Sequence, residues 1–429
     1  MTQPLRIGIA GLGTVGLATV DLLKRNATHI EKRVGRSLVV SEVTARDRNR
    51  ERGIDTAGIN WVEGAVELAR SDNIDVFAEL IGGTGVAKAA IEAALDAGKP
   101  VVTANKALLA EHGLALARRC EEVGVGLYFE AAVAGGVPII KALRDSLAGN
   151  KVSRIYGIMN GTCNYILTKM ESTGREFDDV LGEAQGLGYA EADPTFDIDG
   201  VDTAHKLAIV SSIAFGVPVD LKSIHIEGIR HVTAADIAYA SKLGFRIKLL
   251  GLALQTPHGL EQRVHPCMIP ASSTMAHVEG VRNALFVEGD FVGPLVFEGL
   301  GAGAGPTASA VVGDIVDSAR GFNSPVFGLH TSQLVSESHA SAQDRWGPCY
   351  IRCEVSDQPG VLADIAARLR DHSVSIESVL QRGRDPGERV SVILTTHDSG
   401  ESNFSAALKE IGNLPTLADV PCMIRIENF

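Results

Sequence analysis

The sequence predicts an α/β protein in which a doubly wound parallel sheet is followed by an α+β region and a C-terminal βαββαβ unit. Up to about residue 130, short apolar strands alternate with helical stretches, the pattern of a parallel sheet with helices on both faces. A glycine-rich turn follows the first of these strands. From residue 349 onward, apolar segments recur as strand, helix, strand, strand, helix and strand. A chain of 429 residues is long enough for three hydrophobic cores, so we expect three domains.

The composition favours a small-molecule substrate over a nucleic-acid partner. Hydrophobic residues make up 45% of the chain and charged residues 21%, which is an ordinary globular balance. The net charge of −12 argues against nucleic acid, because binding to phosphates depends on clustered Lys and Arg. The N-terminus leads into a strand without a signal peptide, and no long apolar run follows, so we expect a cytoplasmic protein with no membrane contact. Six cysteines without a CxxC pair indicate reduced, structural thiols.

The glycine-rich turn predicts a Rossmann domain that binds a nicotinamide dinucleotide. It reads Gly11-Leu12-Gly13-Thr14-Val15-Gly16 and lies between the first strand and a helix. Gly11 permits the tight turn, Gly13 lets the backbone approach a pyrophosphate, and Gly16 lets the helix pack closely on the strand. The start of the helix then presents N–H groups to the phosphates. Because the triad occurs with the strand, the helix and further strands, we interpret it as a cofactor site rather than a plain strand-turn-helix.

The end of the second strand leaves the choice between NADP and NAD open. Arg46 and Arg48 are placed to bind a 2′-phosphate, which favours NADP. Asp47 lies between them and is able to accept hydrogen bonds from the ribose of NAD. The two arginines are also compatible with a solvated loop.

The domain boundaries follow from these patterns. Residues 307–320 repeat apolar side chains at helical spacing, and we expect this helix to return to the first domain. We therefore assign residues 1–130, completed by 301–320, to the NAD(P)-binding domain and residues 131–300 to a second domain, for which the family resemblance given below implies substrate binding and dimerisation. Residues 321–348 are assigned to a linker and residues 349–429 to a third domain. The expected strands of the first domain are Leu5–Ala10, Leu38–Thr44, Val76–Ile81, Val101–Ala104 and Leu127–Phe129.

A dense polar stretch supplies the candidates for catalysis. Reduction of a carbonyl forms an alkoxide, so the protein needs a proton donor and positive charge near that oxygen. Asp202 and Lys206 are four residues apart on a helix that continues without charge, so both lie on one face of a mostly buried helix. The alternative is an ordinary exposed ion pair. Lys106 and Glu130 each follow a predicted strand, at the sheet edge where ligands of parallel sheets bind.

Five segments together resemble homoserine dehydrogenase, and the match as a whole covers residues 5–320 in order. They read ELIGG (79–83), TANKALLA (103–110), FEAAVAGGVPII (129–140), GIMNGTCNYIL (157–167) and GYAEADPTFDIDGVDTAHKLAI (188–209). The resemblance implies reduction of L-aspartate 4-semialdehyde to L-homoserine with NADPH or NADH, on the route to threonine and methionine. It also implies a homodimer or homotetramer.

The resemblance implies a role for each matching residue. Lys206 is the proton donor to the aldehyde oxygen, Asp202 is its partner, and Glu191 binds the ammonium group of the substrate. Lys106 touches both cofactor and substrate. Further substrate positions are Asp197, Gly161, Thr162 and Tyr189. A monovalent cation such as Na⁺ is expected at Glu130 with the carbonyls of Val133, Gly135 and Val137, since a hard cation prefers oxygen ligands. The turn around Gly303 closes over the cofactor, and Pro306 suits the first position of the next helix.

The C-terminal unit resembles an ACT domain. Its first strand leads into Asp357-Gln358-Pro359-Gly360, where the glycine lets an amino acid ligand approach the backbone. In homoserine dehydrogenases such a unit implies inhibition by threonine. The alternative is a unit that only dimerises.

Two other functions stay open at this point. One is a dehydrogenase of another amino acid aldehyde or of a hydroxy acid, which the stretch from Glu191 to Lys206 argues against. The other is a catalytically silent amino acid sensor, which has no need of Lys106, Asp202 and Lys206 together.

Overall fold

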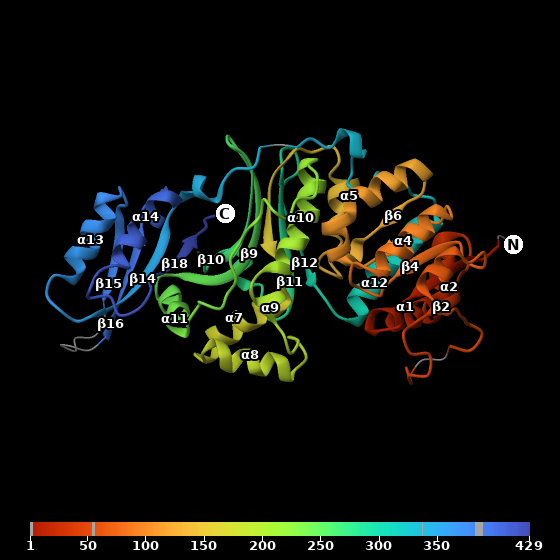
Figure 1. Ribbon diagram of the computed structural model, residues 1–429, viewed down its shortest axis with the longest axis horizontal. Helices are drawn as coiled ribbons and strands as arrows, with labels where there is room; N and C mark the ends of the chain where they lie inside the picture. The colour runs from red at the N-terminus through yellow and green to blue at the C-terminus, as the bar shows by residue number, and fades with distance from the viewer. Residues whose placement is uncertain (1–2, 54–55, 337, 382–388) are drawn as a thin grey trace. The chain divides into compact units, whose positions relative to one another are not determined.

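A computed structural model describes residues 3–53, 56–336, 338–381 and 389–429 (Figure 1). The chain divides into two compact units, each built from separate segments. The first unit contains residues 1–161, 202–224 and 282–337, and the second contains residues 162–201, 225–281 and 338–429. The domain boundaries assigned from the sequence remain predictions.

The first unit holds a sheet of six parallel strands in the spatial order β3, β2, β1, β4, β5, β6, which is the doubly wound arrangement. The strands are β1 (Leu5–Ala10), β2 (Leu38–Thr44), β3 (Asn60–Trp61), β4 (Val76–Glu79), β5 (Val101–Thr103) and β6 (Leu127–Tyr128). The connecting helices are α1 (Thr14–Arg25), α2 (Ala27–Val34), α3 (Ala65–Arg70), α4 (Val86–Asp96) and α5 (Lys106–Val123). The N-terminal sheet and its helices therefore have the predicted Rossmann architecture (Figure 1).

Strand β4 ends two residues earlier than the sequence predicts, at Glu79 instead of Ile81. The buried Glu79 carboxylate accepts hydrogen bonds from the N–H groups of Ile81 and Gly82, at 2.8 and 3.0 Å. These bonds turn the chain away from the sheet, because the N–H groups no longer point to a neighbouring strand.

Helix α12 (Ala304–Ala319) packs into the same hydrophobic core as β1. Its buried side chains Val311, Val312 and Ile315 join Ile7 and Ile9 of β1 there. The helix begins at Ala304, so the prediction that Pro306 takes its first position is wrong by two residues. Pro306 still lies in the first turn, where a missing N–H breaks no helical hydrogen bond.

The remainder of the first unit carries a three-stranded antiparallel arrangement with β11 between β7 and β12. Its strands are β7 (Val152–Ile158), β11 (Arg282–Gly289) and β12 (Gly293–Leu300). Its helical elements are η1 (Glu130–Ala132), α6 (Ile139–Lys141), a π-helical turn η2 (Ala142–Ser146), α10 (Val201–Phe215) and η4 (Thr331–Gln333). Helix α10 is buried from Asp202 to Ile213, as the absence of charge after Lys206 predicts.

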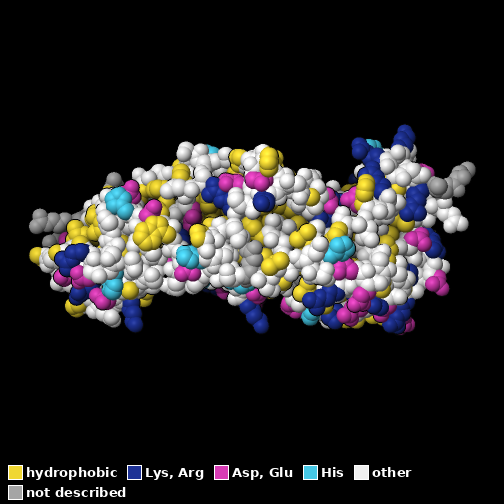
Figure 2. All heavy atoms as spheres, turned by 90° about the horizontal axis from the view of Figure 1, so that it is seen from above, with side chains coloured by type: hydrophobic (Ala, Val, Ile, Leu, Met, Phe, Trp, Pro, Cys, Tyr) yellow, Lys and Arg dark blue, Asp and Glu magenta, His cyan; other side chains and the backbone are white. Residues whose placement is uncertain are grey.

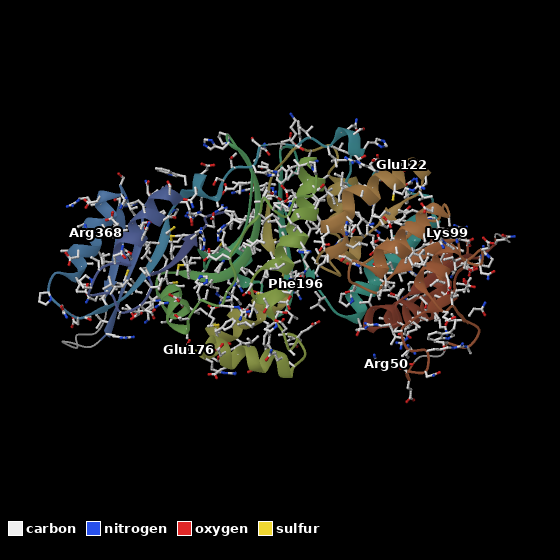
Figure 3. The ribbon with its side chains drawn as sticks, viewed as in Figure 1. Arg50, Lys99, Glu122, Glu176, Phe196 and Arg368 are labelled. Atoms are coloured by element: carbon white, nitrogen blue, oxygen red, sulfur yellow. The ribbon has the colours of Figure 1, made fainter. Side chains whose placement is uncertain are left out.

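The second unit is organised around the long hairpin of β9 (Phe245–Thr256) and β10 (Gly259–Pro270). The short strand β8 (His225–Ile226) pairs with β10. Its helices before the C-terminal part are α7 (Gly161–Thr173), α8 (Phe177–Gly186), α9 (Thr195–Ile198), α11 (Ala234–Lys242) and η3 (Thr274–His277). Phe196, labelled in Figure 3, marks α9.

The C-terminal part has the predicted βαββαβ order and extends the same sheet. Its final strand lies between β10 and β14, so the order continues as β10, β18, β14, β16, β15. The elements are η5 (Ala342–Asp344), β13 (Trp346–Gly347), β14 (Cys349–Ser356), α13 (Val361–Asp371), β15 (Ile376–Gln381), β16 (Arg389–Thr396), β17 (Ser399–Gly400), α14 (Glu401–Ile411) and β18 (Cys422–Ile426).

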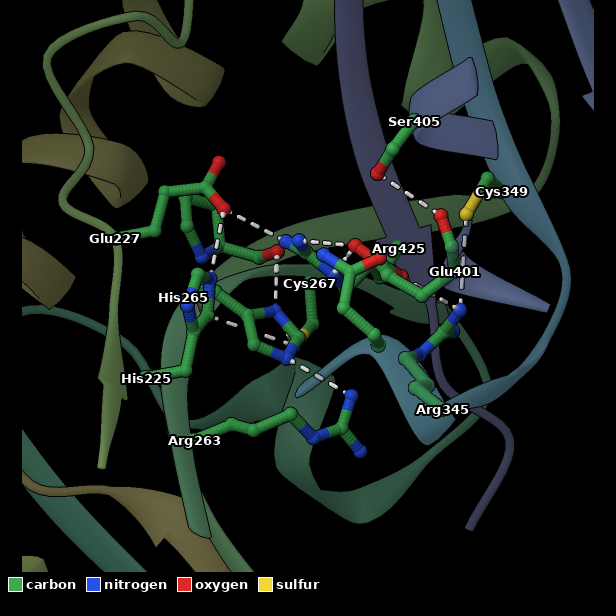
Figure 4. Close-up of polar contacts among 12 residues, drawn as sticks. His225, Glu227, Arg263, His265, Cys267, Arg345, Cys349, Glu401, Ser405 and Arg425 are labelled. Atoms are coloured by element: carbon green, nitrogen blue, oxygen red, sulfur yellow. Dashed lines mark hydrogen bonds and ion pairs between the residues drawn. The ribbon is translucent and has the colours of Figure 1, made fainter. Parts of the chain in front are cut away.

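A network of charged side chains with buried arginines lies where β18 meets β10 (Figure 4). Arg425 of β18 donates to Glu401 at the start of α14 and to Glu227 next to β8, the latter at 2.7 Å. Arg345 donates to Glu427 at 3.2 Å, and Arg263 of β10 lies 3.4 Å from the same carboxylate. Ion pairs and backbone pairing therefore both join the C-terminal part to the hairpin.

The composition also led to expectations about surface charge, membrane-spanning helices and cysteines. Basic side chains lie among acidic ones on the face that Figure 2 shows. Across the described ranges, no helix has the length and apolar character needed to cross a bilayer. All six cysteines are buried and unpaired by disulfides, and Cys349 and Cys353 both point into the C-terminal core, as their spacing on one strand predicts.

Candidate active site

The glycine turn has the geometry that its sequence predicts. Gly11 adopts a φ of +102°, and a Cβ there would lie 2.3 Å from the carbonyl oxygen of Leu80. A Cβ at Gly16 would lie 2.0 Å from the carbonyl oxygen of Gly11. Both positions therefore require glycine. A Cβ at Gly13 would meet nothing within 4 Å, so the space beside its backbone is open to a ligand.

Of the four residues from Leu12 to Val15, two pack in the core and two are exposed. Leu12 is buried in the core of the sheet and Val15 packs against it. Gly13 and Thr14 are exposed at the start of α1, and Gly13 has no side chain with which to cap the helix. The N–H groups of this first turn are therefore available to an anion such as pyrophosphate.

The loop after β2 is rich in arginines, of which Arg46, Arg48 and Arg50 are exposed and Arg52 is half-buried. Arg48 and Arg52 lie over the ring of Trp61, at 5.8 and 5.1 Å from its centre. Arg50 marks this loop in Figure 3. Trp61 therefore holds part of a basic loop at the end of the second strand, where the adenosine ribose of a dinucleotide binds in this fold.

A buried hydrogen-bond chain shapes the carboxyl edge of β4 and β5. The Thr103 hydroxyl donates to Glu79 at 2.6 Å and accepts from the Asn105 N–H at 3.0 Å. Asn105 caps α5 by accepting from Leu108 at 3.1 Å, and its amide donates to the carbonyl of Gly83 at 2.7 Å. This chain fixes the start of α5, where Lys106 is the first residue.

The structure brings three predicted site residues together around one carboxylate. Asp202 is 3% exposed, and its Oδ2 lies 2.7 Å from Lys206 Nζ. Its Oδ1 lies 3.0 Å from Lys106 Nζ. Asn160 donates its side-chain amide to Oδ2 at 2.8 Å. Two ammonium groups therefore share one buried carboxylate at the carboxyl edge of the nucleotide-binding sheet.

The electrostatics of this cluster keep Asp202 ionised. Burial alone would raise the pKa of Asp202, but the charges of Lys206 and Lys106 and the hydrogen bonds from Lys206 and Asn160 hold that pKa well below its usual range. Lys206 donates to Asp202 and to the carbonyl of Met159, both at 2.7 Å. A protonated lysine has three N–H donors, so within the described residues one donor of Lys206 is left for an incoming oxygen.

Three of the predicted substrate residues lie together in the second unit. The Thr162 hydroxyl donates to the carbonyl of Tyr189 at 2.7 Å and lies 3.4 Å from Asp197 Oδ2. The Tyr189 ring meets Tyr165 edge to face, with centres 4.9 Å apart. Gly161 is the first residue of α7. Glu191 is exposed, and its carbonyl accepts from the Gln185 side chain at 3.0 Å.

The predicted cation turn packs against the segment that contains Gly303. Gly135 has a φ of +43°, and a Cβ there would lie 2.6 Å from the carbonyl oxygen of Gly301. Gly136 donates its N–H to the Leu300 carbonyl at 3.0 Å. Gly303 is the N-cap of α12 with a φ of +114°. These contacts hold the two turns side by side.

Glu130 is buried at the start of that turn. Its carboxylate accepts from the N–H groups of Ile140 and Lys141, both at 2.9 Å. Burial and the nearby Asp314 raise the pKa of Glu130 to about 7. Lys141 pairs with Asp314 at 3.1 Å and with Asp317 at 2.6 Å. Glu130 and Asp314 are thus two buried acids beside one lysine.

Comparison with known proteins identifies the family. Three family models match: "Homoserine dehydrogenase, NAD binding domain" at residues 11–130, "Homoserine dehydrogenase" at 138–316 and "ACT domain" at 350–416. Homoserine dehydrogenase of Neisseria gonorrhoeae is 43% identical over 433 residues, covering 100% of this chain and 99% of the relative. The chain belongs to the homoserine dehydrogenase family. It is therefore an NAD(P)-dependent oxidoreductase with a C-terminal ACT domain.

Solved homoserine dehydrogenases share the fold. The enzyme of Thiobacillus denitrificans has a TM-score of 0.93 at 43% identity, and the match covers 99% of each chain. A hyperthermophilic archaeal homoserine dehydrogenase in complex with NADPH has a TM-score of 0.65 at 27% identity. That match covers 75% of this chain and 100% of the archaeal one.

The ACT domain of this chain contains a pocket of about 380 Å³. Gly360 lies in its wall with a φ of +97°, and a Cβ there would meet nothing within 4 Å. The lining residues are Val355, Ser356, Asp357, Gln358, Pro359, Gly360, Val361, Leu362, Gln381 and Val392. The DxPG turn predicted from the sequence thus forms part of a pocket large enough for a small molecule.

Two residues of the candidate site were not predicted from the sequence. Asn160 and Glu79 both stand in segments that carry the resemblance, but no spacing rule links Asn160 to Asp202 or Glu79 to Thr103. The only sequence feature that could have identified them is a polar residue at the end of an apolar strand. The same feature predicted Lys106 and Glu130 as site residues.

Proposed function

We propose that this chain reduces L-aspartate 4-semialdehyde to L-homoserine with NAD(P)H, on the route to threonine and methionine. The observation that supports this most is the cluster of Lys106, Asp202 and Lys206 at the carboxyl edge of the nucleotide-binding sheet. Ligands of such sheets bind at that edge. A silent sensor would have no use for a buried lysine and aspartate with a second lysine beside them.

In this proposal Lys206 is the proton donor. When bound, the nicotinamide supplies a hydride to the aldehyde carbon. The free N–H of Lys206 donates to the aldehyde oxygen, and its proton passes to that oxygen as the negative charge develops. Asp202 stays ionised throughout, so it orients Lys206 and balances its charge. Lys106 supplies a second positive charge, because its ammonium lies 3.0 Å from the other carboxylate oxygen of Asp202.

We assign substrate recognition to residues of the second unit and to Gly161. A carboxylate at Glu191 pairs with the ammonium group of the substrate, and its exposure leaves it accessible. Thr162 and Asp197 supply polar groups, and Tyr189 supplies an apolar wall with a polar edge. These roles rest on the match of each position to the family motif.

We infer a preference for NADP over NAD. The glycine turn fits the pyrophosphate, because the space at Gly13 is open and the α1 N–H groups are accessible. Arg46 is exposed in the basic loop after β2, where the 2′-phosphate of NADP would bind. The NADPH complex of the archaeal relative also supports this preference.

We further infer a monovalent cation such as Na⁺ at the turn of Glu130, Val133, Gly135 and Val137. The donors are oxygen atoms, which suits a hard cation. Glu130 and Asp314 are buried acids beside the single ammonium of Lys141, so a cation there would balance the charge. The cation would hold the turn in the conformation that packs against the Gly301 segment.

Regulation by threonine is assigned to the pocket of the ACT domain. The pocket is lined by backbone of the DxPG turn and by polar side chains, which suits an amino acid. We also infer that the working form is a homodimer or homotetramer, which sedimentation of the purified protein would establish.

One assay tests the function. The purified protein is mixed with aspartate semialdehyde and NADPH, and oxidation of the cofactor is followed by absorbance. The Lys206→Ala variant should lose at least about a hundredfold in kcat, the usual contribution of a positioned acid. Lys222→Ala, an exposed lysine of the same unit, is the matched control and should keep full activity. No turnover by the parent protein would reject the function, and full turnover by Lys206→Ala would reject the assigned acid.

The same assay separates the finer assignments. Replacing NADPH with NADH should lower kcat/KM, and equal values would reject the NADP preference. Replacing Na⁺ with choline should lower the rate if the cation turn is occupied. Millimolar threonine should inhibit the reaction, and an unchanged rate would reject feedback through the ACT domain.

A further inference from the structure

Strand β9 contains a lysine that the reaction does not use, Lys248. Its side chain is among the largest in the molecule that are fully buried, and the residue is 1% exposed. Burying an ammonium group costs several kcal/mol unless its donors are paired. Burying Lys248 therefore costs desolvation free energy, which its hydrogen bonds must offset.

The Lys248 ammonium pairs with two oxygens of the same unit. It donates to Asn164 Oδ1 at 3.0 Å and to the carbonyl of Val278 at 2.8 Å. The amide of Asn164 donates to the same Val278 carbonyl at 3.1 Å. These three bonds form a closed triangle that links β9, the end of η3 and helix α7.

The link to α7 reaches the start of that helix. Asn164 is the fourth residue of α7 and is 1% exposed. The two residues before it contact the Asp197 segment on another side. Thr162 lies 3.4 Å from Asp197 Oδ2, and the Cys163 thiol donates to the Asp197 carbonyl at 3.2 Å. The first turn of α7 is thus held between the Lys248 triangle and the Asp197 segment.

The triangle is a costly way to stabilise a helix. Replacing a buried charged group by an apolar side chain of similar volume is often neutral or stabilising. Burial lowers the pKa of Lys248 to about 8, with Arg246 adding to the effect and Glu171 and Glu279 opposing it. The charged form is therefore disfavoured, yet it prevails at neutral pH. A directional contact to Asn164 is what the ammonium adds over a methionine.

We propose that Lys248 is a positioning residue, which acts through Asn164 to fix the first turn of α7 so that Thr162 meets the substrate. This inference rests on the proposed place of Thr162 in the substrate pocket. Without the ammonium, Asn164 and Val278 lose a donor and the first turn of α7 gains freedom. Substrate binding then weakens, while the cofactor site, built from other elements, is unchanged.

The experiment compares Lys248→Met, Asn164→Leu and the double variant in the full-length protein. Each single substitution should raise KM for aspartate semialdehyde about tenfold and leave kcat and the KM for NADPH within about twofold. The double variant should be no worse than the more affected single variant, because both remove the same link. A fall in kcat with both KM values unchanged, or additive effects in the double variant, would overturn the proposal.

A further variant, Thr162→Val, tests the substrate pocket separately from Lys248. If its KM for the semialdehyde equals that of the parent, the proposed pocket is wrong, whatever Lys248 does. If Thr162→Val raises that KM and Lys248→Met does not, Lys248 is not a positioning residue. Should Lys248→Met fail to fold, Asn164→Leu alone decides, and an unchanged KM there contradicts the proposal.

Discussion

Single carboxylates, either buried or half-buried, join the elements of this protein at the points where they meet. Asp202 gathers two lysines and an asparagine, and Glu79 turns the chain at the end of β4. Glu227 joins β8 to β18 through Arg425. Asp202 and Glu227 are ionised in places where burial alone would disfavour their charge, so their partners carry the stabilisation.

Glu227 makes this dependence measurable. Burial raises its pKa, but His225, Arg425 and His231 together lower the pKa of Glu227 to about 2. A carboxyl group with a lowered folded-state pKa stabilises the fold above the unfolded pKa, near 4.3, and this stabilisation is lost as the pH falls toward 2. Between pH 4.5 and pH 2, the parent should lose about 3 kcal/mol more free energy of unfolding than Glu227→Gln, because the variant has no carboxyl group to protonate at this position.

Urea denaturation at several pH values measures this difference. Glu377→Gln, an exposed carboxyl group on β15, is the control and should follow the parent. If Glu227→Gln also follows the parent, the Arg425 pair contributes nothing to acid stability.

At the scale of elements, the hydrophobic pattern of the sequence predicts the helices and strands that pack against segments nearby in the chain. The runs Leu5–Ala10 and Leu38–Thr44 are fully recovered as β1 and β2, because both are short runs rich in Leu, Ile and Val. The short edge strand β3 was missed, since Asn60 and Trp61 carry no pattern. The start of α12 was placed two residues late, because Pro306 is tolerated anywhere in a first turn.

The same distinction holds for the site. Asp202 and Lys206 lie on one helix, so their spacing alone predicts their contact. The contacts of Lys106 and Asn160 with Asp202 join distant segments and required the structure.

Two substitutions in the glycine turn should have different effects on stability, although both should weaken cofactor binding. Gly16→Ala places a methyl group 2.0 Å from the Gly11 oxygen, so α1 must move off β1. We expect a loss of about 1–3 kcal/mol in stability together with weaker NADPH binding. Gly13→Ala meets no atom within 4 Å, so its thermal midpoint should stay near that of the parent while the Kd for NADPH rises.

Thermal denaturation and fluorescence titration with NADPH measure both quantities. A Gly13→Ala variant that binds NADPH as tightly as the parent would show that the pyrophosphate does not approach the backbone there.

At the scale of the whole molecule, the C-terminal ACT domain is part of the fold of the second unit and not an appended module. Strand β18 pairs with β10, and Arg425 bonds to residues on both sides of that junction. No local pattern in the sequence predicts this pairing, because the two strands are more than 150 residues apart.

A chain ending at residue 336 tests this integration. Without β18, the edge of β10 and the buried Arg263 and His265 beside it become exposed. An open edge strand promotes association between chains, so we expect aggregation or loss of soluble protein. Size-exclusion chromatography reads this out, with the Glu377→Gln full-length protein as the control. A monodisperse, active truncated enzyme would show that the ACT domain is dispensable for folding.

The place of β18 in the sheet also determines when the second unit is completed during synthesis. Its hairpin of β9 and β10 leaves the ribosome well before residues 422–426, which form the adjacent strand. At the rate of translation, about 5–20 residues per second, the nascent chain keeps that hydrogen-bonding edge open for on the order of ten seconds. Until those last residues emerge, β10 presents an unpaired edge strand, which is the feature through which incomplete chains associate with one another.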